Sequence, residues 1–252
     1  MALFKSGNPV LNEKTFEKSF SYTGTDTMTV NGTLNKFGIL FLLTLAAAGY
    51  SWKMVYSGVD ITPYIWPCVL TTLGIAILLV FKMEWAPYLA PVYAIVKGFA
   101  VGVISAFYNH AFDKISPNII TQAVCLTFGV VIAMFLLYRF NIIKATQTFK
   151  KIVLTATMGL AVFYLIAIGL RFANIDIPFL HEGSPIGIVF SLVVVGLAAM
   201  NLIIDFDMIE NHANQGAPKF MEWYGAFALL VTIIWLYIEV LRLLAKIAGS
   251  KK

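Results

Sequence analysis

The chain has 252 residues, of which 60% are hydrophobic and only 12% are charged, and its mean hydropathy is +0.83. A soluble domain carries about a quarter charged residues, so this composition excludes an ordinary soluble fold and indicates a membrane protein in a lipid bilayer. The net charge of +5 does not indicate nucleic-acid binding, because the basic residues stand at the edges of apolar runs, where membrane topology places them.

Residues 1–36 are polar and predict an N-terminal tail. They contain no basic segment leading into a short apolar core, so we do not expect a cleaved signal peptide. The tail has no apolar face to bury, and we expect it to be dispensable for folding up to about Thr33. The apolar domain covers residues 37–247, and residues 248–252 form a short basic C-terminal tail.

Seven apolar runs follow the tail. A helix needs about 20 apolar residues to cross the hydrocarbon core, and most of the runs approach this length. Barrel strands would alternate in polarity over about ten residues, so continuous runs indicate helices. We predict an all-α polytopic bundle of seven transmembrane helices, with six helices and a half-inserted segment as the alternative. The runs lie at about 37–52, 63–81, 87–109, 118–138, 152–172, 185–206 and 224–245.

The third run carries both small residues and a charge. Gly98 and Gly102 form a GxxxG step, which Ser105 continues on the same helix face, and this pattern is typical of closely packed helices. Lys97 precedes the step in the middle of the run. An ammonium group at this depth costs on the order of 3 kcal/mol, so we expect Lys97 to have an acidic partner.

Acidic groups stand in the last two runs. Asp205 and Asp207 end the sixth run, with Asn201 one turn before Asp205, and Glu239 lies deep in the seventh run, three residues before Arg242. One interpretation is that these acids and bases pair to hold the bundle together. The other is a titratable or cation-binding cluster, because two carboxylates in a low dielectric cannot both ionise easily.

The sequence does not indicate an enzyme or a dedicated metal site. His110, His181 and His212 fall between the runs at spacings that match no metal motif, and we expect them to be interfacial or solvated. Cys68 and Cys125 form no CxxC pair and stand within apolar runs. No spacing typical of a catalytic triad is present.

The lysines and arginines predict the orientation. With seven spans, ten of them fall on the side of the N-terminus and six on the other side. This excess favours an N-terminus inside the cell, although the basic C-terminal end opposes it.

Three motifs resemble those of the Bax inhibitor / YccA family of seven-helix membrane proteins. The stretch IIDFDMI in the sixth run is similar to the family's IxD-type motif, and WLYIEVLRLLAK in the seventh to its LYLD-type motif. The stretch YAIVKG in the third run resembles the YA-x-x-EG motif. The motifs are short, and their order and spacing across residues 37–247 carry the resemblance.

The resemblance implies a bundle whose last helix is central and a pH-sensitive leak of calcium. The gating acids would be Asp205 and Glu239, which would hold calcium weakly as the transported ion, with no cofactor. The sequence is more similar to the bacterial branch, which implies the cytoplasmic (inner) membrane. Bacterial members are associated with the membrane AAA protease FtsH and with the Sec translocon.

Two residues depart from the family pattern, and the second of them favours another hypothesis. Glu239 stands where Asp is usual, and Lys97 stands where the third-run motif has Glu. A fixed cation repels calcium, so Lys97 and the polar tail favour a non-conducting regulatory protein that binds a protease or the translocon. The acidic partners expected for Lys97 are Glu239 and Asp205.

The spacing of the acids sets a geometric condition. If the chain turns near Gly216, Asp205 and Glu239 differ in depth by 12 residues, or roughly 18 Å at 1.5 Å per residue. They meet only if residues 207–222 run partly along the surface. Otherwise we expect Asp207 and Glu222 to pair at the mouth of the bundle, and Glu239 to face Lys97 or Arg242.

Overall fold

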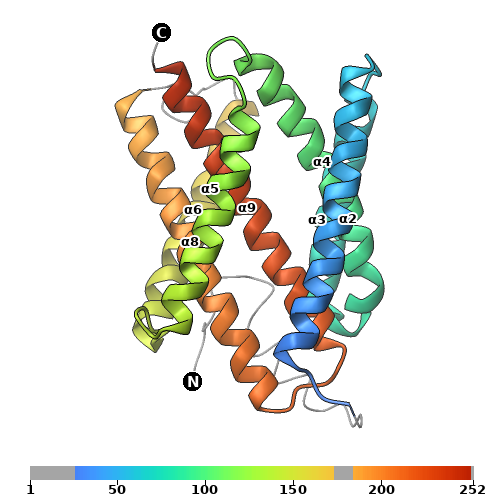
Figure 1. Cartoon of the computed structure of the whole chain (residues 1–252), viewed down its shortest axis with the longest axis vertical. Helices are drawn as coiled ribbons and strands as arrows, with labels where there is room; N and C mark the ends of the chain where they lie inside the picture. Colours follow the sequence, from blue (N-terminus) through green and yellow to red (C-terminus); the bar gives the residue numbers. More distant parts are fainter. Residues whose placement is uncertain (1–25, 173–183, 251–252) are drawn as a thin grey trace.

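The computed structural model describes residues 26–172 and 184–250. Within these ranges seven helices are long and apolar enough to cross a membrane, and the only strand-like pairing is a bridge between Thr27 and Pro218 (Figure 1). The predicted all-α polytopic bundle is therefore confirmed. The elements are α2 (Val30–Tyr56), α3 (Thr62–Phe81), the 3-10 turn η1 (Met83–Trp85), α4 (Ala86–Phe112), α5 (Ile119–Arg139), α6 (Gln147–Phe172), α8 (Pro185–Asn214) and α9 (Met221–Gly249).

Helix α2 begins at Val30, seven residues before the first predicted run. Thr29 caps this helix, and its side chain accepts a hydrogen bond from a backbone N–H of the first turn. Met28 and Thr33 are buried, so residues 26–36 pack with the bundle. The first helix thus begins seven residues inside the predicted tail of residues 1–36. The expectation that the chain up to Thr33 is dispensable for folding stays a prediction. Residues 1–25 lie outside the described ranges.

Helix α8 continues to Asn214, eight residues beyond the predicted end of the sixth run. The apolar pattern stops at Asp207, but this carboxylate is held by Lys150 of α6, so the helix tolerates it. The connection to α9 shortens to residues 215–220 and does not run along the surface from 207 to 222.

Helix α9 is the central helix of the bundle, as the family resemblance implied. In its most apolar stretch 61% of the residues are buried, against 17% in α2, α3 and α5 and 6% in α6. Helices α2, α4, α5 and α8 all pack against α9, which crosses the bundle diagonally in Figure 1. The core includes Tyr93 of α4, whose ring meets that of Phe227 of α9 edge-on at 4.8 Å.

Helices α2 and α4 make the closest helix pair through two glycines. A Cβ atom at Gly98 would collide with the backbone of Thr44, and one at Gly102 with the backbone of Ala48. Thr44 also donates a side-chain hydrogen bond to the carbonyl oxygen of Ala94 across this contact, at 3.2 Å. Small residues let helix backbones approach in a membrane, where van der Waals contact and hydrogen bonds replace the hydrophobic effect between helices.

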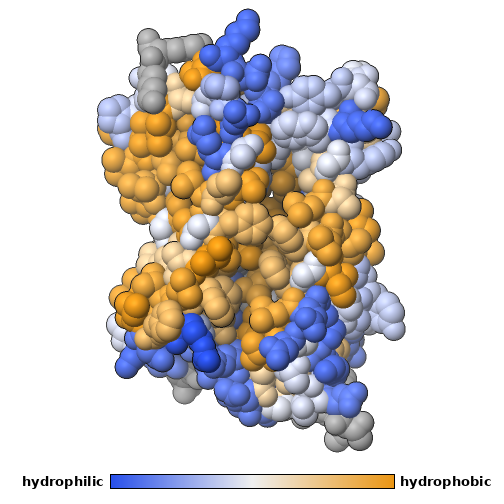
Figure 2. Space-filling model, in the orientation of Figure 1, coloured by the Kyte–Doolittle hydropathy of each residue, from blue (hydrophilic) through white to orange (hydrophobic). Residues whose placement is uncertain are grey.

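The surface is that of a protein surrounded by lipid. Figure 2 shows a broad apolar band around the middle of the molecule, with hydrophilic residues gathered at both ends. Large apolar side chains of the membrane-spanning helices are exposed, for example Leu42 at 66% and Leu165 at 69%. An exposed apolar surface of this extent on a soluble monomer would be an interaction site, and here it is the boundary with the bilayer.

We predict that Gly98→Ala weakens the α2–α4 contact. The added methyl group has no space against Thr44, and overpacking of this kind costs about 1–3 kcal/mol. The measurement is the midpoint of thermal unfolding in detergent. Gly38→Ala on α2 is the matched control, because a Cβ atom there meets nothing within 4 Å. Equal midpoints for the two variants would show that the close approach is not needed.

Candidate functional site

Two buried carboxyl groups lie at the centre of the bundle. Asp205 on α8 is 0% exposed and Glu239 on α9 is 2% exposed. Thr232 of α9 donates a hydrogen bond from its hydroxyl to Asp205 Oδ2 at 2.6 Å. Carboxyl groups are rarely buried to this degree in a membrane without a structural or functional role.

Asn201 lies one turn before Asp205 on the same face of α8. Its side-chain Nδ2 donates to Thr157 Oγ1 and to the carbonyl oxygen of Leu197, both at 2.9 Å. Its Oδ1 is buried, and no donor among the described residues reaches it. Ser191 Oγ, ten residues earlier, is likewise buried and unpartnered within the described chain. The buried face of α8 therefore carries oxygen atoms that remain available as acceptors.

Glu239 is held by a base on its own helix. Arg242 donates from Nη1 to both carboxylate oxygens, at 2.9 and 3.0 Å, and also to the hydroxyl of Tyr164 on α6, at 2.9 Å. The guanidinium lies 5.6 Å from the centre of the Tyr164 ring. One turn later, Lys246 donates to the carbonyl oxygen of Gly187 at 3.0 Å. Of the two arrangements expected for Glu239, the structure has the one with Arg242.

Further acids near the other end of α8 are also paired. Asp207 accepts from the ammonium of Lys150 and, at 2.9 Å, from Asn211 Nδ2. Tyr138 of α5 donates its hydroxyl to Glu210. These contacts tie α5 and α6 to α8.

Asp205 and Glu239 lie at different depths in the bundle. Asp205 contacts Thr232, which precedes Glu239 by seven positions on α9, or about 10 Å along the helix. The difference in depth between the two acids is smaller than the expected value of roughly 18 Å. The expectation assumed that α8 and α9 run equally far from a turn at Gly216, whereas the connection 215–220 places Asp205 opposite Thr232. The acids are thus two separate groups, Asp205 at the contact of α8 with α9 and Glu239 beside Tyr164 of α6.

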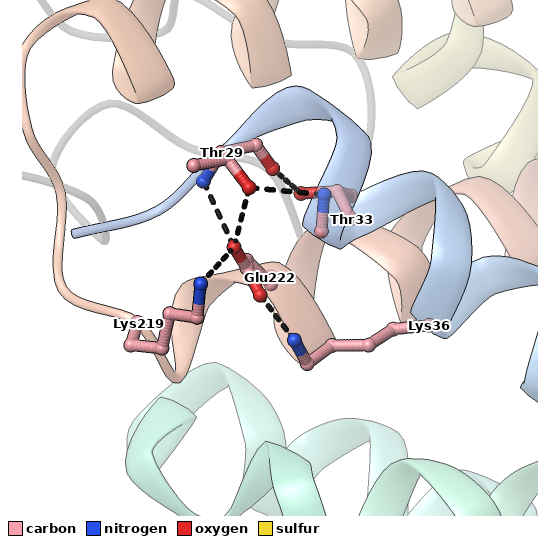
Figure 3. A network of polar contacts seen from close by, with 6 residues as sticks. Thr29, Thr33, Lys36, Lys219 and Glu222 are labelled. Carbon is pink, nitrogen blue, oxygen red and sulfur yellow. Dashed lines mark hydrogen bonds and ion pairs between the residues drawn. The ribbon is translucent and has the colours of Figure 1, made fainter. Parts of the chain in front are cut away.

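A third buried acid, Glu222, joins the beginning of α9 to the beginning of α2 (Figure 3). Its Oε1 accepts from the backbone N–H and the hydroxyl of Thr29, both at 2.9 Å. Lys36 forms an ion pair with Oε2, and Lys219 lies 3.0 Å from Oε1. Gly32 is required beside it, because a Cβ atom there would collide with the carboxylate.

The expected pairing of Asp207 with Glu222 is not found. Within the described residues no hydrogen bond joins the two, because Glu222 is held by two lysines and Asp207 by Lys150. The described ranges also contain no group of three or more His, Cys, Asp or Glu side chains that would hold a metal ion.

A family model described as Bax inhibitor 1 like matches residues 8–249. The chain belongs to the Bax inhibitor 1 like family. The resemblance seen in the three short motifs is confirmed over nearly the whole chain. No curated protein and no solved structure matches the sequence. The family is not a known enzyme family.

Lys97 departs from the family motif and from our expectation of an acidic partner. Its side chain is partly buried on α4, and among the described residues it forms no ion pair with Glu239 or Asp205. The physical reason is that these acids point elsewhere in the bundle, Glu239 toward Arg242 and Asp205 toward α9. The expected pairing of Lys97 with Glu239 or Asp205 is therefore not found among the described residues.

The histidines divide between surface and core. His110 is exposed, as expected, and His181 lies outside the described ranges. His212 is only 5% exposed, and its Nδ1 lies 2.6 Å from the carbonyl oxygen of Met208. The expectation that it is interfacial is wrong because α8 extends to Asn214 and carries it into the packed region.

Several partners of this site were missed in the sequence. Thr157 and Tyr164 look like ordinary residues of an apolar run, and Thr232 carries no distinguishing pattern. Lys150 stands at a basic edge, which predicts a headgroup-facing side chain, yet it is buried. One hint of this burial is present in the sequence. Lys150 lies in the first turn of α6, inside the helix and not in the connection before it.

We predict that Glu222→Gln lowers the stability of the folded protein by about 3 kcal/mol. The substitution removes the charge that Lys36 and Lys219 neutralise, and breaking a buried pair has a cost of this order. Thermal unfolding in detergent measures the effect. Lys219 is 49% exposed, so Lys219→Met is the matched control and should cost far less. If Lys219→Met lowered the stability as much as Glu222→Gln does, the stabilisation would come from the exposed ion pair with Lys219 and not from the buried one.

We predict that Lys97→Met does not lower stability. Its ammonium has no ion pair among the described residues to lose, and methionine keeps the apolar length of the side chain. Lys150→Met should lower the unfolding midpoint, because it leaves Asp207 without its cation. Both midpoints are measured in the same detergent. If Lys97→Met destabilised the protein as much as Lys150→Met does, the prediction would be wrong, and Lys97 would have an acidic partner.

Proposed function

We propose that this Bax inhibitor 1 like protein is a pH-sensitive cation leak that passes calcium, and that Asp205 is the acid the ion meets inside the bundle. The observation that carries the proposal is the buried, unpartnered Oδ1 of Asn201 one turn from the buried Asp205. Calcium prefers carboxylate and amide oxygens, which are the two groups placed here.

The same face of α8 gives the ion a route through the hydrocarbon. Ser191, Asn201 and Asp205 are spaced ten and four residues apart, so they recur on one helix face. From Ser191 to Asp205 the face extends about 21 Å, most of the roughly 30 Å hydrocarbon core. Oxygen atoms at intervals along it replace part of the hydration shell of the ion.

Protonation supplies the dependence on pH. An ionised Asp205 attracts a cation, and a protonated one does not, so the acid sets the charge of the route. Protonation of Glu239 also weakens its ion pair with Arg242, which loosens the contact of α9 with Tyr164 of α6. The two acids act at separate depths, so they need not touch to respond to the same change in pH.

The second candidate function is a non-conducting regulator that binds a membrane AAA protease of the FtsH type or the Sec translocon. The observation that favours it is that Glu222, Asp207 and Glu239 are each held by a lysine or an arginine. A bundle closed by such pairs, with Lys97 as a further cation, opposes the passage of calcium.

The placement that goes with both functions is the bacterial cytoplasmic membrane, with the N-terminus inside. Helix α2 begins at the same end of the bundle as the α8–α9 connection (Figure 1). The basic residues at this end support a cytoplasmic location. They are Lys36, Lys82, Arg139, Lys144, Lys150, Lys151 and Lys219.

The test is calcium flux into proteoliposomes that contain an entrapped indicator, measured across a range of pH. We expect the wild-type protein to pass calcium at a rate that depends on pH, and Asp205→Asn to pass less with a flat profile. Asp113→Asn is the matched control, since this acid is exposed beyond the end of α4 and should leave the profile unchanged.

The outcomes separate the two functions. Flux equal to that of protein-free liposomes at every pH would overturn the leak and favour the regulator. Flux in wild type with an unchanged profile in Asp205→Asn would keep the leak but remove Asp205 from its route. Each variant is compared with wild type for its elution volume in gel filtration, so that misfolding is recognised.

A further inference from the structure

An apolar cavity opens sideways from the bundle, away from the acids of α8. It encloses about 270 Å³ between α2, α4, α5 and α9. Leu45 and Gly49 of α2 and Val124 and Phe128 of α5 line it and are exposed, so the opening lies between these two helices. Figure 2 shows the apolar band hollowed between α2 and α5, where α9 is visible between them in Figure 1.

The hydroxyl groups that line the cavity already have partners within the protein. Thr44 donates to the carbonyl oxygens of Leu40 and Ala94, and Thr127 to that of Ala123. Ser105 donates to a backbone carbonyl, and its Oγ lies 2.7 Å from the hydroxyl of Tyr237 on the floor of the cavity. A cavity lined by apolar and satisfied polar groups does not attract water and takes an apolar occupant.

The cavity has the length of one lipid leaflet. Its lining on α2 runs from Phe41 to Trp52, which is about 16 Å along the helix and about half of the hydrocarbon core. At mid-depth the ring of Phe41 meets the ring of Phe128 edge-on at 5.7 Å, which closes the opening there. An α-helix is about 10 Å wide with its side chains, so the cavity is too small to receive one from a second protein.

The other end of the cavity reaches the level of the lipid headgroups. Trp52 stacks on Tyr56, and the hydroxyl of Tyr56 accepts from Asn109 Nδ2 at 2.7 Å. Tryptophan and tyrosine mark the membrane–water interface. Lys53, in the last turn of α2, is exposed beside them and has the charge to meet a phosphate.

We propose that this cavity binds one acyl chain of a phospholipid, from the leaflet at the C-terminal ends of α2 and α4. The chain enters between α2 and α5 and ends at the Phe41–Phe128 contact. Its phosphate lies by Lys53, outside the opening. The site is distinct from the acids of α8 and does not depend on whether the protein conducts calcium.

The test is photolabelling by a phosphatidylcholine that carries a diazirine at the end of one acyl chain. The full-length protein is reconstituted into vesicles of phosphatidylcholine and phosphatidylglycerol that contain this probe, and adducts are mapped by mass spectrometry. We expect adducts to concentrate on the cavity lining of α2 and α5, severalfold above the exposed face of α6. Gly49→Trp should abolish this excess, because an added Cβ atom meets nothing within 4 Å and the indole fills the opening.

Gly159→Trp on α6 is the matched control. Gly159 is also exposed with open space around it, but lies outside the cavity, so its substitution should leave the excess unchanged. Val124→Trp fills the cavity from the opposite wall and repeats the test if Gly49→Trp does not elute as a folded protein. Uniform labelling of all lipid-facing helices, or an excess that survives both filled variants, would overturn the proposal.

Discussion

The low dielectric around the bundle requires each buried carboxyl group to find its donors inside the protein, and α9 is where this requirement is most severe. Helices α2, α4, α5 and α8 enclose α9, so Glu222 and Glu239 have no access to bulk water. Glu222 is satisfied from α2 and Glu239 from its own helix and α6. An uncompensated buried charge costs several kcal/mol. These contacts therefore fix the positions of the helices relative to one another, in addition to neutralising the buried charges.

The sequence predicts the fold far better than the site, and the physical reason differs for each. Hydrophobic length is a local property, so the runs around α3 and α5 are visible without any knowledge of their neighbours. The ends of helices are less visible, because they depend on partners. Helix α8 continues past Asp207 because Lys150 of α6 pairs with this carboxylate. Helix α2 begins at Val30 because Thr29 caps it and binds Glu222.

Pairing within the site depends on register, which the sequence does not encode locally. Asp205, Glu239 and Lys97 were recognisable as groups that need an explanation, since charges inside spans are costly. Which group meets which follows from a connection of six residues, 215–220, and from the direction of each side chain. Thr232 illustrates the difficulty, because a threonine in an apolar run has no feature that distinguishes a partner of Asp205 from a residue that bonds its own helix.

Helix α9 separates two environments of opposite chemistry. Thr232 and Glu239 are seven residues apart and share the face that carries the polar contacts, whereas Ile233 and Tyr237 point to the apolar cavity. A rotation or tilt of α9 would change both faces together. The Glu222 contacts with α2 fix one end of this helix, and no comparable cluster of ion pairs to α2 is found among the described residues of its C-terminal half. This half is held instead by Arg242, which donates to Tyr164 of α6, and by Lys246, which donates to the carbonyl oxygen of Gly187 of α8.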